Sequence, residues 1–154
     1  MQRARFVPFG LFLFAAVVAV VPPALSYTRA AQDRDAVRMA ALDYVEGIYN
    51  VQPERIQRSV RTNLVKRGFY KKDAATAYVE MPMTFEQLVT LTKNWNKDGK
   101  RDTSIKKVEV LDVLDQTAVA KVTASWGVDY MLLGKFEGAW QITQILWQSP
   151  PPKS

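Results

Sequence analysis

The chain has 154 residues, which is enough for one domain with a hydrophobic core and short for two. It contains no histidine and no cysteine, which excludes disulfides, His/Cys zinc sites and catalysis by Ser-His or Cys-His pairs. The net charge is a modest +6. We therefore expect no nucleic-acid partner, no metal and no cofactor.

The first 26 residues predict a secretory signal peptide. Two arginines, Arg3 and Arg5, precede the apolar run "FVPFGLFLFAAVVAVV" (residues 6–21), and Ala24 and Ser26 are small residues before a cleavage point. An uncleaved anchor is the alternative, but the run is shorter than the roughly 20 residues that span a bilayer. Cleavage removes two basic residues and no acid, so the net charge falls from +6 to +4. The sequence thus predicts an exported protein, periplasmic or extracellular, without membrane contact after cleavage.

Residues 27–149 predict a single domain, and residues 150–154 predict a disordered tail. Residues 27–32 are expected to be a loose lead-in. Apolar side chains then recur at steps of three and four, which predicts a helix from an N-cap at Asp33 to Asn50. A second, short helix is expected over residues 51–60, with Pro53 in its first turn. The pair Thr84 and Gln87 has capping-box spacing and predicts the start of a third helix over residues 83–96.

The remaining segments have the pattern of strands. Residues 64–71 and 76–83 are predicted to be short and extended. From residue 103 the period changes to two, and residues 103–114, 117–125, 128–136 and 139–148 form four strand-like runs joined by short turns. Helices that are segregated from an antiparallel meander indicate an α+β fold.

Three stretches carry a resemblance to a known group: "ALDYVEGIYN" (41–50), "LVKRGFYK" (64–71) and "DYMLLGKFEGAWQITQILW" (129–147). With the element order, they resemble the nuclear transport factor 2-like superfamily, and within it the putative lumazine-binding family. The resemblance implies a cone-shaped, strongly curved antiparallel sheet wrapped by three helices, with a pocket inside. It also implies that members often dimerise through the outer sheet face. Some superfamily members are isomerases or dehydratases, and many only bind a ligand or a protein.

The register of the last hairpin predicts which residues face inward. A two-residue turn at Glu137–Gly138 pairs Phe136 with Ala139. The resulting inner face carries Asp129, Met131, Leu133, Lys135, Trp140, Ile142, Gln144 and Leu146, together with Ala118, Ala120, Val122 and Ala124. The small alanines either leave room for a ligand or let a helix pack closer. A longer or bulged loop would invert this assignment.

The opposite face is too apolar to lie in water. It carries Tyr130, Leu132, Ile145 and Trp147, and contiguous apolar patches of this kind mark interfaces. We expect a homodimer through these residues. Cover by the N-terminal lead-in or the proline-rich tail is the alternative.

The candidate ligand-binding residues for a small apolar or aromatic molecule are Asp129, Gln144, Tyr49, Trp95, Met131 and Trp140. Tyr44, Tyr70, Tyr78 and Trp126 either reach the pocket or pack in the core. Asp129 is also the candidate catalytic residue, because an acid in an apolar pocket has a raised pKa. Its alternative is a solvated charge at the strand end. The basic stretch of residues 66–73 favours a solvated edge strand over an anion-binding surface.

These observations leave three functional hypotheses. The favoured one is an exported, non-enzymatic small-molecule-binding or accessory protein that acts as a homodimer. The second is a cofactor-free isomerase or dehydratase that uses Asp129 as general base. The third is a protein-interaction module that uses the sheet face for another partner.

Overall fold

A computed structural model of the chain describes residues 23–151, with side chains from residue 28 onward. Most of the predicted signal peptide and the end of the predicted tail therefore lie outside the described residues. The described part contains the helices α1 (Pro23–Tyr49), α2 (Pro53–Ser59) and α3 (Phe85–Asn94), and the strands β1 (Val60–Tyr70), β2 (Val79–Met83), β3 (Lys106–Val113), β4 (Thr117–Ala124), β5 (Gly127–Phe136) and β6 (Ala139–Gln148).

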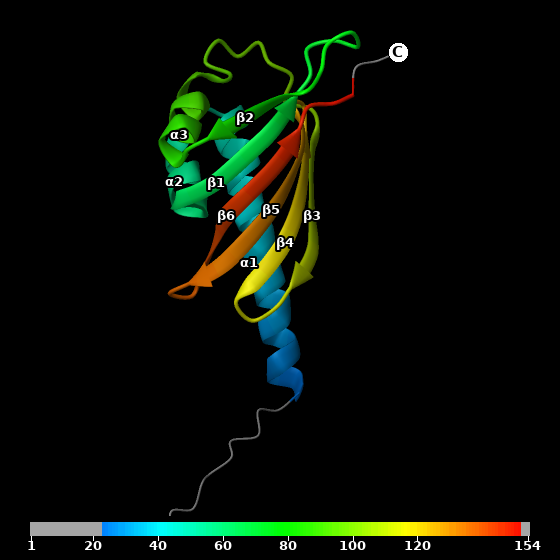
Figure 1. The fold of residues 1–154 in the computed structure, drawn as a ribbon. Helices are drawn as coiled ribbons and strands as arrows, with labels where there is room; N and C mark the ends of the chain where they lie inside the picture. The colour runs from blue at the N-terminus through cyan, green and yellow to red at the C-terminus, as the bar shows by residue number, and fades with distance from the viewer. Residues whose placement is uncertain (1–22, 152–154) are drawn as a thin grey trace, which may run out of the picture.

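The six strands form one curved, unclosed sheet in the order β2-β1-β6-β5-β4-β3 (Figure 1). Neighbouring strands are antiparallel except β1 and β6, which pair in parallel. The long helix α1 crosses one face of this sheet, whereas α2 and α3 lie beside the end formed by β1 and β2 (Figure 1). The α+β class and the antiparallel meander of β3 to β6 are confirmed. No helix within residues 23–151 is long and apolar enough to cross a membrane.

Helix α1 begins about ten residues earlier than the sequence predicts. Residues 27–32 are helical and not a loose lead-in, because this stretch has no glycine or proline and is rich in alanine, arginine and glutamine. Asp33 is consequently inside the helix and not its N-cap. The predicted end is correct, since the helix stops at Tyr49. The capping box of α3 is also confirmed, with Thr84 and Gln87 bonding each other reciprocally.

A β-bulge changes the register of the last hairpin. The pairs Phe136–Ala139 and Leu133–Ile142 form as predicted, but the register then shifts so that Leu132 lies opposite Gln144. One residue of β6, Thr143, is therefore unpaired at this point, as in a bulge. Its hydroxyl donates a hydrogen bond to the Leu132 carbonyl at 3.0 Å.

The bulge turns the second half of β6 over. The inward placement of Gln144 and Leu146 is wrong, because both side chains are exposed on the outer face. The outward placement of Ile145 and Trp147 is wrong for the same reason. Ile145 is buried at 2% exposure, and Trp147, opposite Asp129, lies on the inner face. A period of two along one strand survives only until an extra residue is inserted.

The core lies between α1 and the inner face of the sheet. The four small residues of β4, Ala118, Ala120, Val122 and Ala124, are buried as predicted. They belong to the core cluster together with Ala40, Ala41 and Val45 of α1. Small side chains on both surfaces let the helix approach the sheet, so the alternative of closer helix packing holds here.

Candidate functional site

A pocket of about 210 Å³ opens at the end of the domain where β1, β2 and α3 meet. It is smaller than the roughly 300–1,000 Å³ of pockets for drug-sized ligands, so it suits a compact molecule. Almost all of its lining is apolar or aromatic. The lining residues are Tyr44, Ile48, Lys66, Tyr70, Met81, Met83, Leu88, Leu91, Trp95, Trp126 and Trp147.

Aromatic rings brace one side of the pocket. Tyr49 stacks on Trp95 with ring centroids 5.4 Å apart, and Trp126 meets both rings edge-on at 5.2 and 5.3 Å. Tyr44 makes a further edge contact with Trp126 at 6.2 Å. Edge and offset contacts are the preferred geometries of aromatic pairs. The rings therefore hold one another in place, and the pocket wall is preformed.

Gly68 fixes the position of Trp147 on the opposite side. The two residues are partners across the parallel pair β1–β6. A Cβ atom on Gly68 would lie 1.8 Å from the indole nitrogen of Trp147. Only glycine lets the indole lie directly against the backbone of β1, and this close approach brings the ring to the pocket.

A buried polar group closes the bottom of the pocket. Asp129 is fully buried, and its Oδ1 accepts hydrogen bonds from Lys66 Nζ at 3.2 Å and from the Tyr44 hydroxyl at 3.3 Å. Its Oδ2 accepts from Trp126 Nε1 at 2.6 Å. Lys66 Nζ also donates to the Tyr44 oxygen at 2.9 Å. Both oxygens of the carboxylate are therefore satisfied, as a buried charge requires.

Burial dominates the ionisation of this group. Desolvation lowers the pKa of Lys66 and outweighs the charge and hydrogen bond of Asp129, which act in the opposite direction. Desolvation also raises the pKa of Tyr44 well above its ordinary value of 10.0, and the Asp129 carboxylate adds to this effect. Tyr44 stays neutral, and the Lys66–Asp129 pair carries no net charge.

The arrangement favours a neutral ligand. An ammonium has three N–H groups, and Lys66 uses two of them on Tyr44 and Asp129. The third is left for an acceptor atom in the pocket. A charged ligand would give the desolvated site a net charge, which is costly in an apolar surrounding. No group of three or more acidic side chains within residues 23–151 is arranged to hold a metal ion.

The sequence family fits this geometry. A family model described as putative lumazine-binding matches residues 32–148. The chain belongs to this family. The matched region holds every lining residue of the pocket and the whole buried polar group. No curated protein matches the chain by sequence.

Solved structures of family-like folds agree with the architecture. An NTF2-like protein of unknown function from Shewanella baltica superposes with a TM-score of 0.59 at 16% identity, covering 79% of this chain and 96% of that one. A second, from Silicibacter pomeroyi, gives 0.56 at 10% identity with 84% and 100% covered. A ketosteroid isomerase-like protein from Erwinia carotovora gives 0.53 at 13% identity with 79% and 98% covered. At these identities the likeness shows the fold, which is nuclear transport factor 2-like.

This family member places the predicted site residues in different regions. Trp95 lines the pocket, and Tyr49 is buried behind it with its hydroxyl bonded to Ser125 at 3.2 Å. Met131 is a fully buried core residue. Trp140 is buried at the far end of the sheet, where its indole donates to Asp33. Gln144 is exposed on the outer face of the sheet.

Asp129 is inside, so the alternative of a solvated strand-end charge is wrong. It is not a lining residue of the pocket, however, because Tyr44, Lys66 and Trp126 lie between them. Its role in catalysis stays a prediction.

Sequence reasoning missed Lys66 altogether. The basic stretch of residues 66–73 predicts a solvated edge strand, yet Lys66 is only 6% exposed. Lys66 has the same parity as the inward-facing Leu64 and Gly68 on β1, and this parity is the available signal. Trp147 was missed for another reason, because the bulge in β6 reversed its side.

Proposed function

We propose that this protein is an exported, non-enzymatic binder of a small, flat, neutral and largely apolar molecule. The observation that carries the proposal is the preformed pocket at the α3 end, walled by Trp95, Trp126 and Trp147. Aromatic walls bind planar ligands by stacking, and a single polar anchor gives orientation. Family membership supports a ligand-binding role, because the family is described as putative lumazine-binding.

Binding without turnover is favoured because the Asp129 carboxylate is already hydrogen-bonded and is separated from the pocket. A general base needs to reach the proton that it removes, at hydrogen-bond distance or through one water. The Asp129 oxygens accept three hydrogen bonds from Tyr44, Lys66 and Trp126, and those side chains separate it from the pocket. The isomerase or dehydratase hypothesis would require this group to open during the reaction.

Tryptophan fluorescence tests the binding proposal. Three of the four tryptophans line the pocket, so 2-naphthol, a neutral two-ring phenol, should quench or shift the emission in a saturable way. A Met81→Arg variant places a charge at a half-open lining position and should weaken binding by about tenfold or more. Met81 is 41% exposed, so the substitution should leave the fold intact.

Leu114→Arg is the matched control, because Leu114 is exposed and far from the pocket. It should bind 2-naphthol as the wild type does. Equal loss in both variants, or no saturable binding at all, would overturn the proposal. Lumazine, titrated in parallel, should bind more weakly than 2-naphthol, because its ring nitrogens and carbonyls would lose their hydration against an apolar lining.

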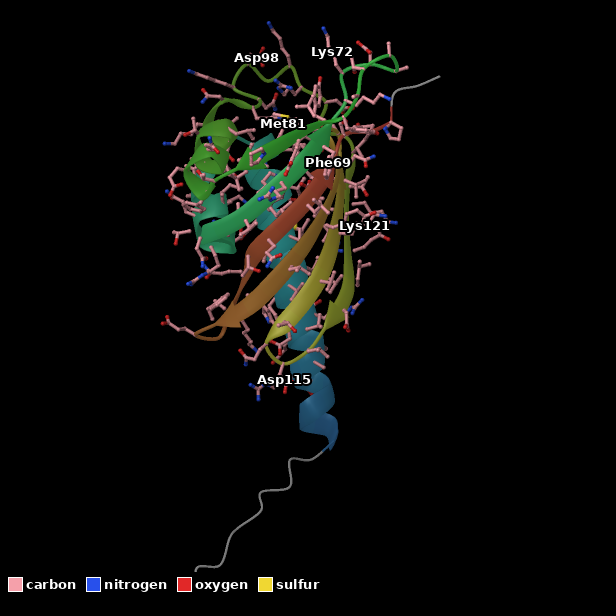
Figure 2. All side chains as sticks on the ribbon, in the orientation of Figure 1. Phe69, Lys72, Met81, Asp98, Asp115 and Lys121 are labelled. Atoms are coloured by element: carbon pink, nitrogen blue, oxygen red, sulfur yellow. The ribbon has the colours of Figure 1, made fainter. Side chains whose placement is uncertain are left out.

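We also propose that two copies pair through the outer sheet face. Its apolar residues are exposed and contiguous across β1, β6 and β5 in the sheet order: Val65, Phe69, Tyr130, Leu132 and Leu146. The predicted residues Tyr130 and Leu132 are 51% and 45% exposed there, whereas Ile145 and Trp147 take no part because they face inward. In Figure 2 this face lies between Phe69 on β1 and Lys121 on β4.

Light scattering during size exclusion tests this pairing. The wild type should elute as a dimer, and Leu132→Lys should elute as a monomer, since a charge in an apolar interface is costly to desolvate. Met39→Lys, at an exposed position on helix α1 and not on the sheet, should remain dimeric. A monomeric wild type would exclude the homodimer and favour a different partner for the face.

Export is tested separately by N-terminal sequencing of the protein from the periplasmic fraction, where a start near residue 27 is expected.

A further inference from the structure

The Lys66 amine is placed in the pocket where it could act as a nucleophile as well as a hydrogen-bond donor. Lys66 is the one lysine that lines the pocket, and its side chain is 5% exposed. Its Nζ lies 5.4 Å from the ring centroid of Tyr44 and 5.5 Å from that of Trp147, and both rings are part of the lining. A nucleophilic atom is thus placed at the bottom of an apolar, ligand-sized space.

The neighbours of Nζ form a short proton relay. The Tyr44 oxygen accepts from Nζ at 2.9 Å, and its hydroxyl faces Asp129 Oδ1 at 3.3 Å. Asp129 Oδ1 also lies 3.2 Å from Nζ directly. A proton can therefore leave Nζ for the carboxylate by either route. Burial lowers the pKa of Lys66, and a lysine desolvated in this way is more readily available as the free amine.

We propose that Lys66 captures an apolar aldehyde or ketone in this pocket as a reversible imine on Nζ. The inference rests on the proposed function, because it takes the same pocket as the ligand site. It names the ligand class as flat, neutral carbonyl compounds of one or two rings. It predicts covalent, reversible binding without a change in the carbon skeleton.

The step balances with groups that are present. Nζ passes a proton to Asp129, and its lone pair forms a bond to the carbonyl carbon. The carbonyl oxygen takes up a proton from the Tyr44 hydroxyl, which lines the pocket and is reprotonated by Asp129. A second proton moves from nitrogen to the new hydroxyl by the same route, through Asp129 and the Tyr44 hydroxyl. The C–O bond breaks, water leaves, and a C=N bond forms. One ammonium and one carbonyl thus give one protonated imine and one water, with no oxidant or reductant.

The product state keeps the charge of the site unchanged. The protonated imine carries the positive charge that the ammonium carried, and Asp129 is again a carboxylate beside it. Tyr44 and Trp126 can then donate to the Asp129 carboxylate as they do before the reaction. Since the carboxylate remains paired, the imine avoids the large cost of an unpaired buried charge.

Reductive trapping of the full chain tests this inference. The protein is incubated with 2-naphthaldehyde and sodium cyanoborohydride, which converts an imine into a stable secondary amine. Intact mass should increase by one naphthylmethyl group, and peptide mapping should place it on Lys66. Labelling of Lys66 should be about tenfold faster than labelling of any exposed lysine. Lys66→Arg keeps a cation beside Asp129 and should lose this label, whereas Lys72→Arg, at an exposed loop position, should keep it.

A competition measurement covers the case in which Lys66→Arg does not fold. Excess 2-naphthol, which cannot form an imine, should protect Lys66 of the wild type from the label. Slow labelling spread over exposed lysines, with Lys66 unmodified, would overturn the inference. If 2-naphthol still binds in that case, the proposal of a ligand-binding pocket is kept and only imine formation on Lys66 is rejected. If neither 2-naphthol nor the aldehyde binds in the pocket, both the ligand-binding proposal and the imine proposal are rejected.

Discussion

The two ends of the domain contain the same three residue types in the same pattern, yet they differ in character. At the pocket end, Asp129 accepts hydrogen bonds from Lys66 and from the indole of Trp126. At the other end, Asp33 of α1 accepts from Lys135 and from the indole of Trp140. Figure 2 shows the two ends, with Met81 near the first and Asp115 near the second.

The difference is burial. The side chains of Asp129 and Lys66 are 0% and 5% exposed, whereas those of Asp33 and Lys135 are 14% and 13% exposed. Beside Asp33 the surface has a wide hollow of about 1080 Å³, whose walls are mostly polar residues. The narrower pocket at the Asp129 end is apolar. The same trio is thus a partly exposed tie between helix and sheet at one end, and a desolvated polar anchor at the other.

The largest expected contrast comes from removing each acid. Asp129→Ala leaves Lys66 buried without a partner and should lower the free energy of unfolding by about 3–5 kcal/mol. Asp33→Ala leaves a partly exposed lysine and should cost less, about 1–2 kcal/mol. Urea unfolding of the two variants measures both losses. The double variant Lys66→Met/Asp129→Leu should regain most of the stability, because it leaves no unpaired charge. Equal losses at the two ends would contradict the comparison.

A substitution at Gly68 tests the close packing that is peculiar to the pocket end. Gly68→Ala places a methyl group where Trp147 lies and should lower the free energy of unfolding by about 2 kcal/mol. The displaced indole should also weaken 2-naphthol binding. Thermal unfolding and the fluorescence titration report the two effects. Unchanged stability would mean that the indole does not lie against β1.

Removing each indole donor should give a smaller contrast. Trp126→Phe leaves the buried Asp129 Oδ2 without its donor and should cost about 1–2 kcal/mol. Trp140→Phe should cost less than about 1 kcal/mol, because water can reach the partly exposed Asp33. Chemical unfolding of both variants gives the comparison. A larger loss for Trp140→Phe would show that burial is not the deciding difference.

The smallest expected effect is in the pH dependence of the trio of Asp33, Lys135 and Trp140. The hydrogen bonds from Lys135 and Trp140 lower the pKa of Asp33 below its ordinary value of 3.8. The unfolded chain therefore binds this proton first, and stability is lost as the pH falls below about 3.8. The stability difference between the wild type and Asp33→Asn should shrink on acidification from pH 7 to pH 3. A difference that stays constant would show that the pKa is not lowered.

Local rules predicted most of the fold. The capping box at Thr84 and Gln87, the turn after Phe136 and the alternation in β4 each depend on neighbours within a few residues, and all three are found. Aspartate is a common N-cap, which predicts that α1 begins at Asp33. The helix begins earlier because the residues before Asp33 favour the helical conformation more strongly than the cap favours a boundary.

The candidate site was predicted less well, since its parts come from α1, β1, β6, α3 and the β4–β5 turn. The turn at Glu137–Gly138 and the period of two together correctly predict that Asp129 lies on the inner face. The bulge at Thr143 puts Trp147 and Gln144 on the faces opposite to those predicted. No short sequence pattern indicates this bulge. The basic stretch of residues 66–73 predicts a solvated edge strand, and a lysine in it is expected in water. The partner of Lys66 is 63 residues away in sequence.

The sequence by itself determined the α+β class, the family resemblance, and the inward position of a lone acid on the last hairpin. It did so because caps, turns and alternation act between near neighbours. Only the tertiary structure decided what that acid does. It brought Lys66, Tyr44 and Trp126 around Asp129 and set an aromatic pocket before them. Whether an ion pair is desolvated or hydrated depends on everything packed around it, and that is a property of the whole fold.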